Sequence, residues 1–162
     1  MSSLYVSCVA LLEDSAAELY EKLVKRCENN QVKLILLEIL YETKKHGELL
    51  RHIHKMGDGE ETIPSYGKCE KEMGSLFRDS LELITHLRKQ VERGKEPIKS
   101  IIMDSINFEK GFGEEYSSGI YAKISSLVET SPTIKEVFNH IAEDEKRHVK
   151  MLQLASKLLS WQ

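Results

Sequence analysis

The sequence predicts an all-α fold built from two antiparallel helical hairpins. Long segments repeat apolar residues every three or four positions, which is typical of helices with one buried face. Strand-like alternation is scarce, and the chain contains only three Pro in 162 residues. The junction inside each hairpin is short, and short junctions force neighbouring helices to run antiparallel. We therefore expect one domain over residues 1–162, a four-helix bundle with one long crossover.

Five helices are expected along the chain. Their approximate bounds are 3–28, 31–56, 68–93, 97–129 and 132–160. The first two and the last two form the hairpins, and the third lies in the crossover that joins them. Its apolar stripe is either packing surface or, if the other four helices close the bundle, a dimer interface. Ser131 followed by Pro132 marks the start of the last helix, because these residues favour the N-cap and first helical positions.

The fourth helix contains three glycines, Gly111, Gly113 and Gly119. Each weakens a helix by about 1 kcal/mol relative to Ala. Either close packing requires them, or the helix is irregular around residues 111–113. The sequence leaves both alternatives open.

The composition excludes several classes of protein. Hydrophobic residues make up 41% and charged residues 30%, an ordinary soluble composition, and the net charge of -3 provides no basic surface for nucleic acid. No apolar run reaches the roughly 18–20 residues of a membrane span. The first residues lack the basic stretch and cleavage pattern of a secretory signal. We expect a cytoplasmic protein with no membrane or nucleic-acid partner.

The cysteines give little sign of a structural or metal-binding role. Cys8, Cys27 and Cys69 are odd in number, widely spaced and form no Cys-x-x-Cys pair. This argues against a disulfide framework, a zinc ribbon and an iron–sulfur site. We expect Cys8 and Cys27 to be small core or boundary residues, because free cysteines are often buried.

Both hairpins interrupt their apolar faces with the same kinds of residue. The first helix of each carries a Glu and, seven positions later, a Tyr, while the second carries an acid and a His about one turn apart. These residues are Glu13, Tyr20, Glu42 and His46 in the first hairpin and Glu109, Tyr116, Glu145 and His148 in the second. Buried carboxylates are costly without a cation. A pair of divalent metal ions, bound by oxygen and imidazole donors, removes that cost.

The stretches around the two histidines form a partial repeat. Aligned on His46 and His148, the matching pairs are Glu42 with Asp144, Thr43 with Glu145, Lys44 with Lys146 and Lys45 with Arg147. The basic residues are expected to lie on solvated faces. Thr43 stands where the later copy has its carboxylate, so the second helix supplies a carboxylate ligand only if Glu42 reaches the site from the neighbouring position.

The pattern resembles the ferritin-like superfamily, most closely its rubrerythrin-type branch. In that group a four-helix bundle holds a di-iron or di-manganese site, with one Glu from each of two helices and a Glu-x-x-His from each of the other two. The resemblance implies a ligand set of Glu13, Glu42, His46, Glu109, Glu145 and His148. Glu115 is the alternative to Glu109. Tyr20 and Tyr116 are either core aromatics or hydrogen-bond partners of the ligand carboxylates.

The resemblance further implies a function in iron oxidation or in O2 or peroxide chemistry. Iron is the expected metal, with manganese or zinc as alternatives, and no organic cofactor or catalytic residue is assigned. The chain lacks the Cys-x-x-Cys module that delivers electrons in rubrerythrins, so the electron donor and the status as a ferroxidase- or peroxidase-type enzyme stay open. A homo-oligomer is expected, with a dimer favoured. The alternative is a ferritin-like bundle with a partial or lost metal site that acts as an oligomeric binding or scaffold protein.

Overall fold

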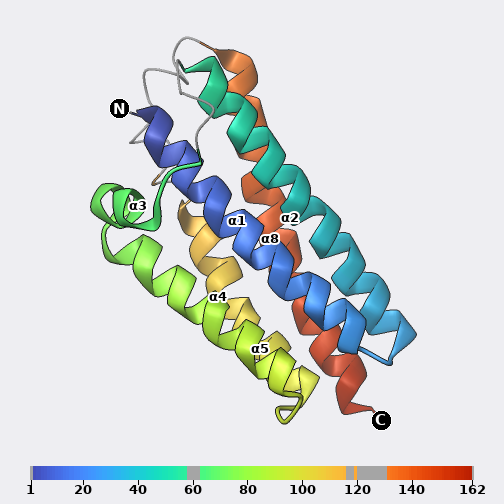
Figure 1. Ribbon diagram of the computed structural model, residues 1–162. Helices are drawn as coiled ribbons and strands as arrows, with labels where there is room; N and C mark the ends of the chain where they lie inside the picture. Colours follow the sequence, from blue (N-terminus) through green and yellow to red (C-terminus); the bar gives the residue numbers. More distant parts are fainter. Residues whose placement is uncertain (1, 58–62, 116–118, 120–130, 162) are drawn as a thin grey trace.

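A computed structural model describes residues 2–57, 63–115, 119 and 131–161. Within these ranges the chain forms six helices and no strand, which confirms the all-α prediction. The helices are α1 (Ser2–Arg26), α2 (Asn30–Met56), α3 (Tyr66–Met73), α4 (Ser75–Arg93), α5 (Ile98–Glu114) and α8 (Pro132–Ser160) (Figure 1). None of these helices is both long enough and apolar enough to cross a membrane.

The long helices pack around one shared interior. α1 packs on α2 and on α4, α8 packs on α5 and on α2, and α4 also packs on α5 (Figure 1). Helix α4 therefore touches both α1 and α5, and its apolar stripe is buried within the chain. The buried members of this stripe are Phe77, Ile84, Leu87 and Val91. Of the two roles expected for this stripe, the structure shows packing surface.

Local sequence signals fix the starts of two helices. The side chain of Asn29 accepts hydrogen bonds from the backbone N–H groups of Gln31 and Val32, both at 3.0 Å, and so caps α2. Ser131 accepts one from the N–H of Ile134 at 3.4 Å and caps α8. These caps place α2 and α8 within a residue of their predicted starts.

The crossover differs from its prediction. Instead of one helix over 68–93, a short α3 and a longer α4 meet at Gly74, whose φ of 66° and ψ of -142° are non-helical. A positive φ strains residues that carry a side chain, so Gly is suited to this break. The apolar periodicity continues through this position, and periodicity alone therefore missed it.

Helix α5 is regular through the glycines where an irregularity was an open alternative. It runs to Glu114, and a π-helical turn begins only at Glu115. Gly113 is buried, and a Cβ added there would lie 3.6 Å from Cβ of Glu145. This is an ordinary van der Waals distance, so packing of α5 on α8 leaves room for a Cβ and does not by itself require the glycine. Residues 116–118 and 120–129 of the predicted helix lie outside the described residues.

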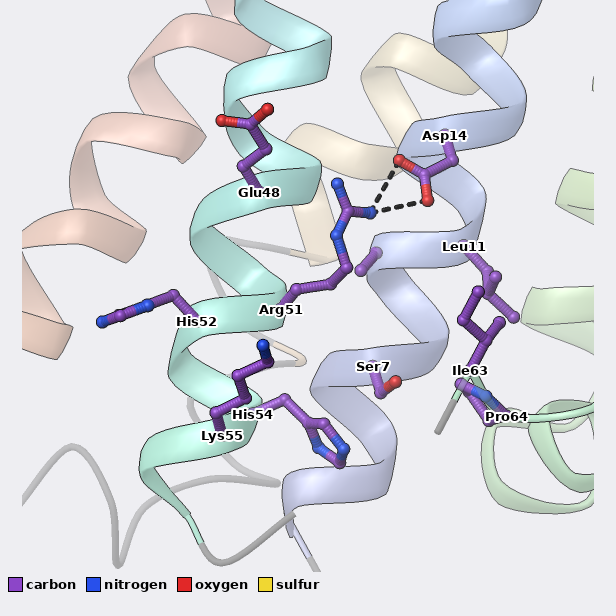
Figure 2. A pocket seen from close by; sticks show the side chains of 11 residues that line it. Ser7, Leu11, Asp14, Glu48, Arg51, His52, His54, Lys55, Ile63 and Pro64 are labelled. Carbon is purple, nitrogen blue, oxygen red and sulfur yellow. Dashed lines mark hydrogen bonds and ion pairs between the residues drawn. The ribbon is translucent and has the colours of Figure 1, made fainter. Parts of the chain in front are cut away.

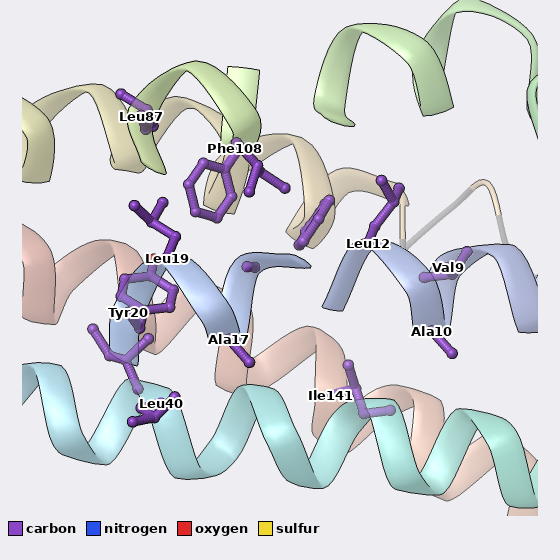
Figure 3. Packing of buried hydrophobic residues seen from close by; sticks show 14 of the residues in the cluster. Val9, Ala10, Leu12, Ala17, Leu19, Tyr20, Leu40, Leu87, Phe108 and Ile141 are labelled. Atoms are coloured by element: carbon purple, nitrogen blue, oxygen red, sulfur yellow. The ribbon is translucent and has the colours of Figure 1, made fainter. Parts of the chain in front are cut away.

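Large apolar side chains fill the interior between α1, α4 and α5. Figure 3 shows Leu19 of α1 directed toward Phe108 of α5 and Leu87 of α4. The rings of Tyr20 and Phe108 lie 6.1 Å apart between centroids. Fully burying one such side chain contributes about 1.5–3 kcal/mol. This layer brings α1 and α5 into contact in the core, through Tyr20 and Phe108.

The expectation for the cysteines was wrong in one respect. Cys8 of α1 and Cys69 of α3 form a disulfide across 61 residues of sequence, while Cys27 is free and buried, as expected. The two sulfur atoms meet because α3 folds back on α1. Sequence spacing carries no information about such a meeting between distant elements.

Candidate metal centre

Five ionisable side chains lie together in the interior with almost no solvent exposure. Glu13, Glu109 and Glu145 are each 1% exposed, and His46 and His148 are 0% exposed. They come from all four long helices that the sequence paired into hairpins, α1, α2, α5 and α8. Each belongs to the predicted ligand set.

The five residues form two groups that share one carboxylate. Glu13, His46 and Glu145 form the first position, and Glu109, His148 and Glu145 form the second position. In each group the donor atoms lie within 4.8 Å of one another. Donors about 2.0–2.2 Å from one metal ion and at right angles lie about 3 Å apart. The groups therefore have dimensions that fit one ion each, with little adjustment.

Glu145 lies between the two imidazoles. Its Oε1 is 2.9 Å from Nδ1 of His46 and 3.7 Å from Nδ1 of His148. The two imidazole rings are stacked, with centroids 5.8 Å apart. Both histidines therefore turn Nδ1 toward the same carboxylate.

Three buried atoms at this point lack a properly aligned hydrogen bond. Among the described residues, neither oxygen of Glu145 nor Nδ1 of His46 has one, although the 2.9 Å contact brings two of these atoms together. A buried polar atom without a partner is costly, and native proteins usually satisfy it with protein, water or an ion. Here the orphaned atoms are a carboxylate and an imidazole nitrogen, which are metal donors.

The outer nitrogen of each histidine is held by an acid. His46 donates from Nε2 to Asp144 at 3.0 Å, and His148 donates from Nε2 to Glu42 at 2.9 Å. An ionised carboxylate only accepts hydrogen bonds, so each Nε2 carries a proton, and a ring that loses its second proton keeps the lone pair on Nδ1. Such outer carboxylates orient metal-binding histidines and fix their tautomers.

Two basic residues connect these outer acids to the surface. Arg147 donates to Asp144 at 2.7 Å and also donates to Glu42, so one guanidinium joins both outer carboxylates. Lys45 contacts only Asp144, at 2.8 Å. Both basic side chains are about half exposed, at 45% and 50%. They were expected only to be solvated, and their pairing across helices was not visible in the sequence.

Tyr20 supports the second position. Its hydroxyl donates to Oε1 of Glu109, so the tyrosine of the first hairpin binds a ligand-type carboxylate of the second. Burial, together with the charge of Glu109, raises the pKa of Tyr20 well above its usual value, so the phenol keeps its proton. Tyr116, its counterpart in the repeat, lies outside the described residues.

Without a cation, protons balance the buried charges. Burial lowers the pKa of His46, but contacts with Asp144 and Glu145 outweigh it and raise that pKa to about 9. Burial also lowers the pKa of His148, but the hydrogen bonds and negative charges of Glu109 and Glu145 outweigh this effect and raise that pKa to about 11. Burial and the charge of Glu145 raise the pKa of Glu109 to about 8. A divalent ion bound at Nδ1 would replace these histidine protons.

The structure places the remaining predicted residues outside the two groups. Within the described part of the chain, Glu42 belongs to neither group, and it contacts the outer side of His148 and Arg147. Thr43 is buried, and its hydroxyl donates to the carbonyl of Ile39 at 2.8 Å. Glu115, the alternative to Glu109, accepts a hydrogen bond from Tyr5 instead.

Sequence reasoning missed Asp144 as a functional residue. Asp144 had already been aligned with Glu42 in the repeat, and both acids now occupy equivalent places behind the two histidines. The repeat was therefore the signal that could have identified Asp144.

A surface cavity of about 420 Å³ lies elsewhere, between α1 and the end of α2 (Figure 2). Its most prominent contact is the ion pair of Arg51 with Asp14, at 2.6 and 2.8 Å. A Cβ at Gly47 would lie 2.8 Å from Oδ1 of Asp14, so this glycine leaves room for the pair. The cavity contains none of the five clustered residues. The candidate site is therefore the buried cluster rather than this cavity.

Comparison of the chain with protein-family models, with curated proteins and with solved structures finds no match. The functional interpretation below therefore depends on the geometry and chemistry of the site.

Proposed function

We propose that this chain is a metal-binding, ferritin-like protein whose four-helix bundle of α1, α2, α5 and α8 holds a pair of divalent ions. The observation that supports this most directly is Glu145, a buried carboxylate between two imidazoles with both oxygens lacking an aligned hydrogen bond. Three buried carboxylates lie at the two positions, and bound divalent cations would offset the cost of burying their negative charge. Iron is the favoured metal, and manganese or zinc also suit these donors.

In this proposal each position has its own donors and one shared donor. Glu13 and His46 would hold the first ion, Glu109 and His148 would hold the second, and Glu145 would contribute to both positions. Asp144 and Glu42 hold the imidazoles in the tautomer that leaves Nδ1 available. Tyr20 fixes the orientation of Glu109. Glu42 thus supports His148 instead of replacing the carboxylate that Thr43 lacks.

The proposed activity is iron oxidation or the reaction of bound iron with O2 or peroxide. Bound iron would supply the electrons for this chemistry. The chain excludes water from the site through the burial of its ligands, and it offers protonated groups close by. Tyr20 holds its phenolic proton beside Glu109, and the outer carboxylates link both histidines to Arg147 near the surface.

Metal loading of the purified protein tests the proposal. The chain is stripped with a chelator, loaded anaerobically with Fe(II), freed of excess metal and analysed for bound iron. We expect about two ions per chain, and optical changes on exposure to air or peroxide that do not occur with Glu145→Gln. A wild-type chain that retains no iron, manganese or zinc after loading would contradict the proposal.

One observation favours a second candidate function. Thr43 leaves α2 without a carboxylate between the rings, so the site has one acid fewer than the ferritin-like pattern. A bundle with this deficit is a candidate for an oligomeric binding or scaffold protein that keeps one ion or none. Retention of wild-type stability and oligomeric state by His148→Ala, with no metal bound in either protein, would favour this function.

A further inference from the structure

Helix α3 is held against α1 mainly by one disulfide bond. The helix has only eight residues, and Cys69 is its only buried residue. This side chain is joined to Cys8 of α1, and both are 0% exposed. Isolated helices this short are not stable in water. The position of α3 against α1 therefore depends on the disulfide more than on apolar packing.

The ends of α3 allow it to move separately from α4. Gly74 joins the two helices with a positive φ of 66°, and nothing lies within 4 Å of the place where its Cβ would be. A glycine in open space permits large changes of backbone angle at low cost. The ring of Tyr66 packs on Phe77 of α4 at 6.2 Å between centroids, and Tyr66 is itself 61% exposed. Gly74 is thus a suitable hinge.

Helix α3 also contacts α1 and α4 and reaches the apolar interior through its last residue. Met73, its last residue, lines a small internal cavity together with Leu12 of α1 and Phe112 of α5. Leu12 precedes Glu13 in the chain. Phe112 precedes Gly113, which packs on Glu145. The cavity beside Met73 is therefore lined by residues next in sequence to Glu13 and Gly113, on the two helices that supply Glu13 and Glu109.

From this arrangement we infer that the Cys8–Cys69 disulfide is a redox switch that controls the docking of α3 and, through it, access to the metal centre between α1 and α5. The switch itself is independent of the proposed function, and only the effect on access rests on it. Disulfides in reducing compartments are usually transient or redox-sensing rather than structural. In the cytoplasmic location that the sequence predicts, this bond would belong to that class.

The chemistry is thiol–disulfide exchange. Two equivalents of a small thiol reduce the bond through a mixed disulfide, which yields Cys8–SH, Cys69–SH and one oxidised small disulfide. In the reverse direction a hydroperoxide oxidises one thiolate to the sulfenic acid. The second thiol then displaces water and restores the bond, so hydrogen peroxide and two thiols give one disulfide and two water molecules. Because both sulfur atoms are buried, exchange requires α3 to open.

Limited proteolysis of the full chain tests the switch without any metal. Lys68 and Lys71 of α3 are exposed trypsin sites, while the exposed Lys44 of α2 is an internal reference. In a Cys27→Ser background, reduction with dithiothreitol should accelerate cleavage in α3 on the order of tenfold or more, because cleavage follows local opening. Cleavage at Lys44 should not change. Stoichiometric hydrogen peroxide, after removal of dithiothreitol, should restore the slow rate.

A variant provides the second measurement. Cys69→Ser should show fast cleavage of α3 without any reductant, and neither dithiothreitol nor peroxide should alter it. If reduction leaves the cleavage of α3 unchanged in the Cys27→Ser protein, the inference is wrong. If Cys69→Ser cleaves at Lys44 as fast as in α3, the bond supports the whole fold and is not a local switch, which also overturns the inference.

The access step has its own readout. Chelator removal of Co(II) from the loaded protein should be on the order of tenfold faster after reduction, because α3 then no longer packs against the apolar interior. If the reduced protein shows fast cleavage in α3 but Co(II) leaves at an unchanged rate, access is not controlled by α3. If Co(II) binds neither form, the proposed metal function fails, while the proteolysis result still decides the switch.

Discussion

The first and second positions of the metal centre have matching inner donors but different outer support. Each turns one imidazole Nδ1 toward Glu145 and adds one Glu from the helix at the start of a hairpin. Behind the first position, Asp144 receives hydrogen bonds from His46, Lys45 and Arg147. Behind the second, Glu42 receives hydrogen bonds from His148 and Arg147, and Tyr20 adds a bond at the inner carboxylate.

If the proposed metal site exists, this difference indicates which features the two hairpins must share. Two similar ions would impose similar requirements on the inner donors, which match. The outer contacts differ because an imidazole needs only one correctly placed acceptor, which either helix can provide. Substitution of the shared Glu145 should affect both positions, whereas substitution of the histidines, the outer carboxylates or Tyr20 should affect one position at a time.

The largest effect is expected from the shared residue. Glu145→Gln removes a negative charge from both positions, so both ions should bind more weakly by about a hundredfold or more, equivalent to about 3 kcal/mol each. Titration with Co(II), followed by visible absorbance, measures both affinities. The exposed Glu143→Gln on the same helix is the matched control. Loss of only one ion in Glu145→Gln would show that the carboxylate is not shared.

Substitution of each histidine should abolish one position and leave the other intact. His46→Ala should remove the first ion and His148→Ala the second, so that metal content falls from about two to about one per chain in each variant, because each position has a single imidazole donor. Metal analysis after gel filtration measures this content, and the exposed His140→Ala should keep both ions. Equal loss of both ions in either variant would mean that the two positions bind as one unit.

The helical periodicity of the sequence was enough to identify the buried acids of the candidate site. It did not identify the contacts that side chains make between helices. Glu13, Glu109 and Glu145 were identifiable because each stands at an apolar position of a helical stripe. Which side chains meet across helices depends on the rotation and height of each helix, which a stripe does not specify. The bond from Tyr20 to Glu109 and the disulfide from Cys8 to Cys69 are contacts of this kind.

The hairpin order and most helix bounds were likewise predictable from local signals. The break at Gly74 was not, because apolar residues stay in phase on both sides of it. Glycine inside a helical pattern is often tolerated, so its presence alone does not mark a break. The place of Asp144 behind His46 required knowing that α2 and α8 are neighbours.

The outer carboxylates should produce intermediate and selective effects. Asp144→Asn should weaken the first position and Glu42→Gln the second, each by about tenfold to a hundredfold, because a neutral amide oxygen is a weaker acceptor for the imidazole than a carboxylate. The effect of Asp144→Asn should be the larger, since Asp144 has three hydrogen-bond donors. Separate Co(II) affinities test this, with the exposed Glu38→Gln as control. A Glu42→Gln variant that loses the first ion would show that Glu42 acts as a ligand there.

The smallest effect is expected at the tyrosine. Tyr20→Phe removes one hydrogen bond to Glu109, so the second position should bind about fivefold to tenfold more weakly, equivalent to about 1–1.4 kcal/mol. The first position should keep its affinity. The same Co(II) titration reads both values, and the exposed Tyr41→Phe is the matched substitution. An equal change at both positions would mean that Tyr20 acts through general packing.

The hydrogen bonds exchanged between α2 and α8 have a consequence for how the protein folds. Each hairpin orients its own histidine with an acid borrowed from the other: His46 uses Asp144, and His148 uses Glu42. The first position also takes Glu145 from the second hairpin. A fragment with only α1 and α2 would lack Glu145 of the first position, whereas a fragment with only α5 and α8 would hold all three inner residues of the second position but not Glu42 behind His148. Ion capture at the first position would therefore report that both halves of the chain have docked in the correct register, so that a bound metal would act as a checkpoint for folding.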